Sequence, residues 1–163
     1  MSAVIAQAIT EATAAFRGDP LNARATFKSE SQLTNGFRSE VRIREHSLTV
    51  DEPTRIGGTN DGPTPVELVL AALGTCQEIT YRAFATALDI PLEHVAVTVE
   101  GDIDFRGFFA IDPKVRPGFD AIRVTVNLTS SASAAEQARL REMVNRHCPV
   151  LDMLTRPVPV TFP

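Results

Sequence analysis

Apolar side chains recur at helical spacing near the start of the chain and then alternate with polar ones. The first pattern predicts an N-terminal helical extension over residues 1–20, because Gly18-Asp19-Pro20 ends the periodicity. The alternation that follows predicts a meander of strands over residues 23–50. Asn35-Gly36 lies inside this stretch and marks a hairpin turn, since both residue types accept a positive φ.

A long apolar segment begins after a loop rich in glycine and proline. Thr64 and Glu67 have the spacing of a capping box, with Pro65 at the first helical position, and they predict a central helix over residues 64–88. The first half of that helix, Val66 to Cys76, is apolar on every face. A helix of this kind is buried all round, so we expect it to be wrapped by sheets or enclosed in a dimer.

The last part of the chain, residues 95–162, is expected to form a second α/β half. Two alternating stretches predict two strands, and a capping box then opens another helix. Cys148-Pro149 follows that helix and begins a short turn or helix, with Cys148 at its N-cap position. Residues 158–162 are predicted to form an edge strand, because Pro159 lacks an N–H. The length suits a single domain over residues 1–163.

Composition narrows the range of partners. The formal net charge is -4, which argues against non-specific binding to nucleic acid or to anionic membranes. No N-terminal secretory signal is visible, and the longest apolar run is far shorter than the roughly 18 residues of a membrane span. We therefore expect a cytoplasmic protein, in which thiols are kept reduced.

The chain has two cysteines, and each admits two interpretations. Cys76 lies in the apolar segment, where it is either a small buried residue or a nucleophile, and a reactive thiolate there needs a cation within about 4–6 Å. Cys148 lies at the start of a short helix, where free N–H groups and the helix dipole favour a thiolate, although a plain helix boundary has the same features. The three histidines lack the spacing of zinc ligands, and we expect neither a metal nor an organic cofactor.

Two arginines are candidates for the cation beside Cys76. Arg38 follows the predicted hairpin turn, and Arg55 lies in the loop before the central helix. Arginine stays charged at any working pH and offers a planar fork of donors, so either residue can hold a thiolate and orient a peroxide oxygen. Glu67 has two candidate roles as well. It either orients the arginine and accepts a proton, or completes the capping box.

Two stretches, Gly57 to Cys76 and His147-Cys148-Pro149-Val150, form a specific pattern when they occur together. This pattern resembles the OsmC/Ohr family, the osmotically inducible and organic hydroperoxide resistance proteins. The order of the predicted elements is similar too, so the resemblance covers roughly residues 23 to 162. It implies an α+β fold in which antiparallel sheets wrap around a long central helix, and an intertwined homodimer.

The resemblance also implies an activity. Cys76 matches the position of the family's peroxidatic cysteine, and Cys148 matches the resolving one. Cys76 then reacts with an organic hydroperoxide to give a sulfenic acid, and Cys148 condenses with it to a disulfide. The implied reductant is a dithiol such as a dihydrolipoyl group.

At one other position this chain differs from the family pattern, and at another it offers two candidate residues. The family's catalytic glutamate lies ten residues before the first cysteine, where this chain has Val66, and Glu67 comes one residue later. Arg38 resembles the arginine of the hydroperoxide-resistance branch, and Arg55 resembles that of the osmotically inducible branch. The leading hypothesis is a thiol-dependent peroxidase. The alternative is a non-catalytic OsmC-like protein that senses redox state or binds an apolar ligand.

Overall fold

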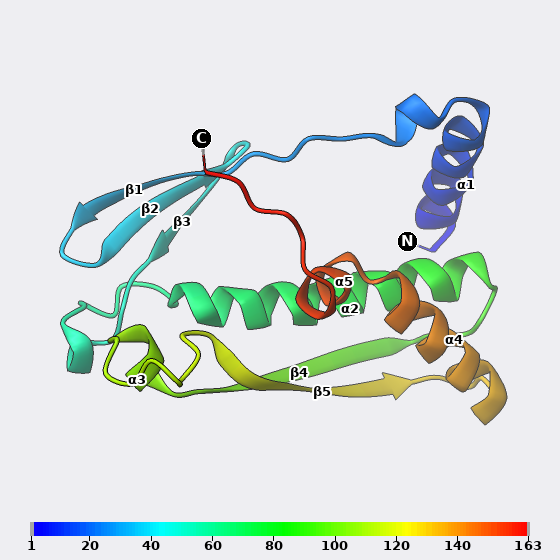
Figure 1. Cartoon of the computed structure of the whole chain (residues 1–163). Helices are drawn as coiled ribbons and strands as arrows, with labels where there is room; N and C mark the ends of the chain where they lie inside the picture. The colour runs from blue at the N-terminus through cyan, green and yellow to red at the C-terminus, as the bar shows by residue number, and fades with distance from the viewer. Residues whose placement is uncertain (1, 163) are drawn as a thin grey trace. The chain divides into compact units, whose positions relative to one another are not determined.

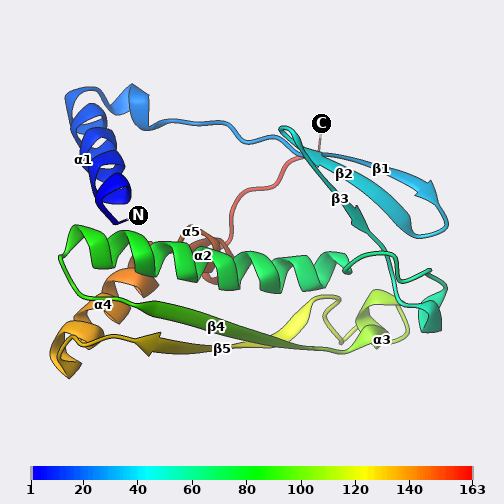
Figure 2. The ribbon, with the colours of Figure 1, turned by 180° about the vertical axis from the view of Figure 1, so that it is seen from behind.

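The computed structural model describes residues 2–162 of the chain. These residues form two compact units. Asp19–Val69 make one, which we call the meander unit, and the rest of the described chain makes the other, which we call the cysteine unit. Figures 1 and 2 show the helices and strands of both units.

The meander unit contains one antiparallel sheet with the strand order β1-β2-β3. Its strands are β1 (Glu30–Asn35), β2 (Arg38–Ile43) and β3 (His46–Val50), preceded by the short helix η1 (Pro20–Ala23) and followed by η2 (Thr54–Ile56). The predicted hairpin turn is present: β1 pairs with β2 in antiparallel fashion, and Gly36 in the turn between them has a φ of 55°. The meander lies within the range that alternation predicts (Figure 1).

The long helix α2 (Pro65–Ala87) begins in the meander unit and continues along the chain into the cysteine unit. Its start is the predicted capping box. The Thr64 N–H donates to Glu67 Oε2 at 2.7 Å, and the Glu67 N–H donates to the Thr64 hydroxyl at 3.3 Å. Of the two roles that the sequence allows for Glu67, the carboxylate performs the structural one.

The cysteine unit combines a two-stranded antiparallel sheet with helices. In chain order, its other elements are α1 (Ser2–Gly18), β4 (His94–Ile103), α3 (Phe105–Phe108), β5 (Phe119–Thr129), α4 (Ala134–His147) and α5 (Pro149–Thr155). Figures 1 and 2 show α2 running along the β4–β5 pair. Side chains of α2 and α4 and of the α2–β4 loop form the core, which consists of Tyr81, Ala85, Ile90, Leu92, Leu140 and Val144. The architecture is thus mixed α+β with small antiparallel sheets.

One prediction needs correction. Residues 158–162 form no strand, because no strand of the described chain pairs with them. Within one chain, the first half of α2 is not buried all round, and its enclosure by a second copy stays a prediction. Leu73 is 1% exposed, whereas Val69 is 36% exposed and Ile79, in the second half, is 70% exposed. The described chain therefore buries only one side of this apolar helix.

Candidate active site

Cys76 and Cys148 meet in the cysteine unit. Their Sγ atoms lie 3.3 Å apart, although 72 positions separate the two residues in the sequence. Both thiols are free; Cys148 is buried and Cys76 is partly exposed. The structure therefore combines one thiol that a small molecule can approach with a second thiol directly behind it.

Helix geometry explains how Cys148 reaches this position. Its N–H donates to the carbonyl oxygen of Val144 at 2.9 Å and closes α4, while its own carbonyl oxygen accepts from the Asp152 N–H at 3.0 Å and opens α5. Pro149 occupies the first position of α5, where a helix has no use for an N–H. Cys148 is the predicted N-cap, and the sharp junction of two helices turns its sulfur toward α2.

Of the two interpretations of Cys148 that the sequence leaves open, the plain helix boundary agrees better with its surroundings. Burial raises the pKa of the Cys148 thiol, although the N–H groups of Leu151 and Val150 act in the opposite direction. The low polarity around the sulfur outweighs the start of a short helix. Cys148 therefore keeps its proton and donates it in a hydrogen bond to the sulfur of Cys76.

Two further polar side chains lie on the buried face of α2 and were missed by the sequence analysis. Gln77 is 2% exposed and Tyr81 is fully buried. Gln77 Oε1 and the Tyr81 hydroxyl have no hydrogen-bond partner within residues 2–162. Burial raises the pKa of Tyr81, so its hydroxyl stays neutral. Their spacing of four residues on an apolar helix is the signal that sequence reasoning could have used.

Arg38 lies in the meander unit, and two carboxylates hold its guanidinium. Its Nε and Nη2 donate to Glu40 Oε1 at 3.1 and 2.9 Å, and Nη1 donates to Asp61 Oδ2 at 2.9 Å. These partners, with Glu40 the stronger, raise the pKa of Arg38. A guanidinium has five N–H donors, so the three bonds leave donors of Arg38 for another acceptor.

Arg55 differs from Arg38. It lies in η2 with an exposed side chain, and it forms no ion pair with any residue from 2 to 162. Arg38, Arg55 and Glu67 all belong to the meander unit, whereas Cys76 and Cys148 belong to the cysteine unit. The structure brings the two cysteines together, and the pairing of an arginine with Cys76 stays a prediction.

The cysteine unit contains an apolar cleft, and neither cysteine is among the residues that line it. It has a volume of about 390 Å³ and extends between α2, β5 and α5. Leu73 precedes Cys76 by three residues and Leu151 follows Cys148 by three, so one wall of the cleft is about one helical turn from each sulfur. Its lining residues are Leu73, Arg116, Phe119, Asp120, Ala121, Ile122, Val124, Leu151, Leu154 and Thr155. Most of this surface suits an alkyl or aryl group.

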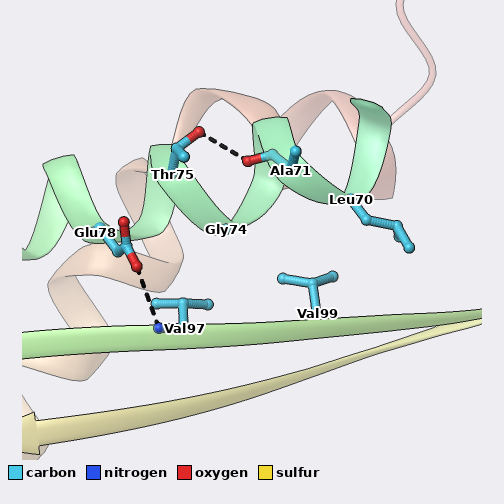
Figure 3. Close-up of a pocket in the computed structure, with 7 residues that line it drawn as sticks. All are labelled: Leu70, Ala71, Gly74, Thr75, Glu78, Val97 and Val99. Atoms are coloured by element: carbon cyan, nitrogen blue, oxygen red, sulfur yellow. Dashed lines mark hydrogen bonds between the residues drawn. The ribbon is translucent and has the colours of Figure 1, made fainter. Parts of the chain in front are cut away.

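A smaller pocket of about 210 Å³ lies between α2 and β4 (Figure 3). Its floor is narrow because Gly74 approaches β4 closely; an added Cβ would lie 3.4 Å from Val99 Cγ2. Figure 3 shows the Glu78 carboxylate pointing to β4, where Oε1 accepts from the Val97 N–H at 3.3 Å. Glu78 thus links α2 to the backbone of β4.

Within residues 2–162, no three His, Cys, Asp or Glu side chains gather into a set able to hold a metal ion. No helix in the same part of the chain has the length and apolar character needed to cross a membrane.

Solved structures of similar fold include several OsmC-type proteins. An OsmC-like protein from Mycoplasma pneumoniae superimposes with a TM-score of 0.71 at 19% identity, covering 82% of this chain and 89% of that one. An organic hydroperoxide resistance protein OsmC from Legionella pneumophila gives 0.63 at 21% identity, covering 84% and 94%. An organic hydroperoxide resistance protein from Elizabethkingia anophelis gives 0.62 at 21%, covering 82% and 90%. These similarities establish the fold.

No curated protein matches the chain in sequence. The family described as OsmC-like protein matches residues 58–162, which include both cysteines and most of the cysteine unit. On this match, together with the fold, the chain belongs to the OsmC-like protein family.

Proposed function

We propose that this protein is a cysteine-based, thiol-dependent peroxidase that reduces organic hydroperoxides in the cytoplasm. The observation that carries the proposal is the 3.3 Å separation of the Cys76 and Cys148 sulfurs. Two thiols from distant parts of a chain, one partly exposed and one buried, suit a pair in which one attacks and the other resolves. Membership of the OsmC-like family, some of whose structural relatives are named organic hydroperoxide resistance proteins, supports the same activity.

In the first step, the Cys76 thiolate attacks the terminal oxygen of the hydroperoxide. An S–O bond forms and the O–O bond breaks, so that the alkoxide leaves and takes a proton to become an alcohol. Cys76 is thereby oxidised to a sulfenic acid. Cys148 assists before this step, because its thiol donates a hydrogen bond to Cys76 Sγ and so stabilises negative charge there.

In the second step, Cys148 resolves the sulfenic acid. Its sulfur attacks Cys76 Sγ, an S–S bond forms and the S–O bond breaks. The departing hydroxide combines with the proton of the Cys148 thiol to give water. A dithiol reductant, such as a dihydrolipoyl group, then exchanges with the disulfide, restores both thiols and is itself oxidised to a disulfide.

The substrate class follows from the apolar cleft of the cysteine unit. Its walls are mainly aliphatic, and it is about one helical turn from both sulfurs. An alkyl or aryl hydroperoxide gains free energy by burying its hydrocarbon part there, whereas hydrogen peroxide has no such part. We therefore infer that the protein prefers organic hydroperoxides to hydrogen peroxide.

We assign the activating cation to Arg38 rather than Arg55. Arg38 is fixed by Glu40 and Asp61, so little side-chain entropy is lost when it binds a reacting group. It retains free N–H donors for a peroxide oxygen. The exposed Arg55 lacks such support, and Glu67 acts as a helix cap.

We also propose that the chain acts as a single OsmC-like domain in a homodimer. The outward side of α2 is apolar, with Ile79 70% exposed and Val69 36% exposed. A soluble chain covers a surface of this kind by association, and a second copy offers the same helix.

The test is stopped-flow reduction of cumene hydroperoxide with a dithiol, comparing wild type with Cys76→Ser and Cys148→Ser. Turnover in wild type that disappears in Cys76→Ser supports the peroxidase. Absence of turnover with every dithiol contradicts it and favours the non-catalytic alternative, a redox-sensing or apolar-ligand-binding protein.

A further inference from the structure

Asp51 is a buried carboxylate without a cation. It is 1% exposed and forms no ion pair within the described part of the meander unit. Four hydrogen bonds satisfy it instead. Oδ1 accepts from the Glu52 N–H at 2.8 Å, and Oδ2 accepts from the Thr59 N–H at 2.9 Å, the Thr59 hydroxyl at 2.6 Å and the Asp61 N–H at 3.2 Å. The ends of one loop thus converge on a single side chain.

The loop around Asp51 leaves no room for a side chain at two of its glycines. A Cβ on Gly58 would lie 1.8 Å from the Glu52 carbonyl oxygen, and a Cβ on Gly62 would lie 2.2 Å from the Thr49 carbonyl oxygen. The backbone closes through a bond of 3.2 Å from the Asp51 N–H to the Pro63 carbonyl oxygen. Backbone approach this close is possible only with glycine at both positions. The backbone of this loop is therefore closely packed against itself at Gly58 and Gly62.

This loop ends at the guanidinium of Arg38. Asp61, whose N–H is bound by Asp51, accepts from Arg38 Nη1 at 2.9 Å through its own carboxylate. Glu40 on β2 binds the other edge of the same guanidinium and also accepts from the Thr49 hydroxyl at 3.2 Å. Arg38 is therefore held from two sides, by a strand and by the loop that Asp51 organises.

We propose that Asp51 is a positioning residue for Arg38. It fixes the backbone of Asp61, and Asp61 in turn fixes the plane of the Arg38 guanidinium; the catalytic consequence rests on the proposed peroxidase function. Only a carboxylate serves here, because all four partners are donors and asparagine would turn an NH₂ group toward one or more of them. The hydrogen bond from the Thr59 hydroxyl, with those from the backbone, holds the pKa of Asp51 far below its usual range, so the acceptor persists at working pH.

A double-mutant cycle tests the proposal. The variants are Asp51→Asn, Arg38→Met, the two combined, and Asp61→Ala, which cuts the link at an exposed residue. The rate of Cys76 oxidation by cumene hydroperoxide is expected to fall about 10-fold in Asp51→Asn and in Asp61→Ala, and Asp51→Asn is expected to have no further effect in the Arg38→Met background. The proposal would be overturned if the double variant lost the product of the two single fold-losses in rate. A wild-type rate in Asp61→Ala would overturn it as well.

A matched control and a second readout separate this proposal from the peroxidase hypothesis. Asp102→Asn removes a carboxylate that pairs with Arg123 on the β4–β5 sheet, and its oxidation rate should equal that of wild type. The NMR signal of the Arg38 Nε–H reports its position without any turnover. Broadening or loss of that signal in Asp51→Asn and Asp61→Ala, with retention in Asp102→Asn, supports positioning. An unchanged signal contradicts it, whereas absence of turnover in wild type contradicts only the peroxidase.

Discussion

The cysteine pair and the Asp51 loop each contain a buried side chain, Cys148 and Asp51, but the polar groups of the two regions are satisfied to different degrees. Asp51 accepts four hydrogen bonds, and together they hold the loop in a single conformation. The Cys76 sulfur, by contrast, has one hydrogen bond, from the thiol of Cys148. The neighbouring Gln77 Oε1 has no hydrogen-bond partner in the described chain. Complete satisfaction produces rigidity, whereas a weakly held sulfur can leave its partner and react.

The same contrast appears in the charges. Hydrogen bonds hold the pKa of Asp51 far below its usual range, whereas burial raises the pKa of Cys148. The loop thus contains a permanent anion that organises donors, and the cysteine unit contains a thiol that stays neutral until its partner is oxidised.

The largest effect is expected at Cys76. Replacing it with serine removes the attacking sulfur, so peroxide reduction should fall about 100-fold or more, because a serine hydroxyl at neutral pH is a far weaker nucleophile than a thiolate. Steady-state consumption of cumene hydroperoxide measures this loss. A rate within a few-fold of wild type would show that the reaction uses another group.

Cys148→Ser should alter the product more than the first step. Sulfenic acid still forms on Cys76, but no thiol lies behind it to condense, so excess peroxide should carry it on to the sulfinic acid. Mass spectrometry of the intact variant should show two added oxygen atoms, whereas wild type loses two hydrogens. Accumulation of the same product in both proteins would contradict the resolving role.

Arg38→Met should slow the oxidation of Cys76 about 100-fold, as loss of an oriented donor to a developing oxyanion does in other enzymes. Arg55→Met is its matched control, since it removes the same charge from a side chain that has no support in η2. The second-order rate constant for thiol oxidation, measured by stopped flow, compares the two. The opposite ranking would transfer the role to Arg55.

A smaller effect concerns pH. A thiol whose pKa is raised in the folded protein stabilises that state below the pKa of the unfolded thiol, and this stability is lost as pH rises through the folded value. The free energy of unfolding under reducing conditions should therefore decline as pH rises above about 8.5, the ordinary pKa of a thiol, and the decline should be less steep in Cys148→Ala. Urea titrations at several pH values measure both slopes. Equal slopes would show that burial does not perturb this thiol.

The smallest effect is expected at the helix caps. Thr64→Ala at the start of α2 and Ser133→Ala at the start of α4 should each lower the free energy of unfolding by about 1 kcal/mol. The rate of thiol oxidation should stay at the wild-type value in both, since neither cap touches a sulfur. A large loss of rate in Thr64→Ala alone would show that the cap also controls the position of Cys76.

Local signals predicted the elements of this fold well. Thr64 and Glu67 define a capping box whose two hydrogen bonds are present, and Gly36 occupies the hairpin turn with a positive φ. These features depend on neighbours within four residues, which a sequence displays directly. The strand predicted over residues 158–162 is absent, because an alternation of apolar residues does not show whether a pairing strand exists.

The site was less predictable because its contacts are long-range. Sequence spacing cannot bring Cys76 and Cys148 together, and only the family resemblance implied that pair. The sign of the Cys148 shift depends on how deeply the sulfur is buried, which one sequence does not reveal. The hydrogen bonds of Asp51 have no signal in the sequence, since its donors come from positions up to ten residues away.

The most direct test is the mass of the intact reduced protein after one equivalent of cumene hydroperoxide, followed by peptide mapping without reductant. The account predicts the loss of two hydrogens and a cross-linked peptide that contains Cys76 and Cys148. Unchanged thiols, or oxygen added to Cys76 with Cys148 still reduced, would contradict it.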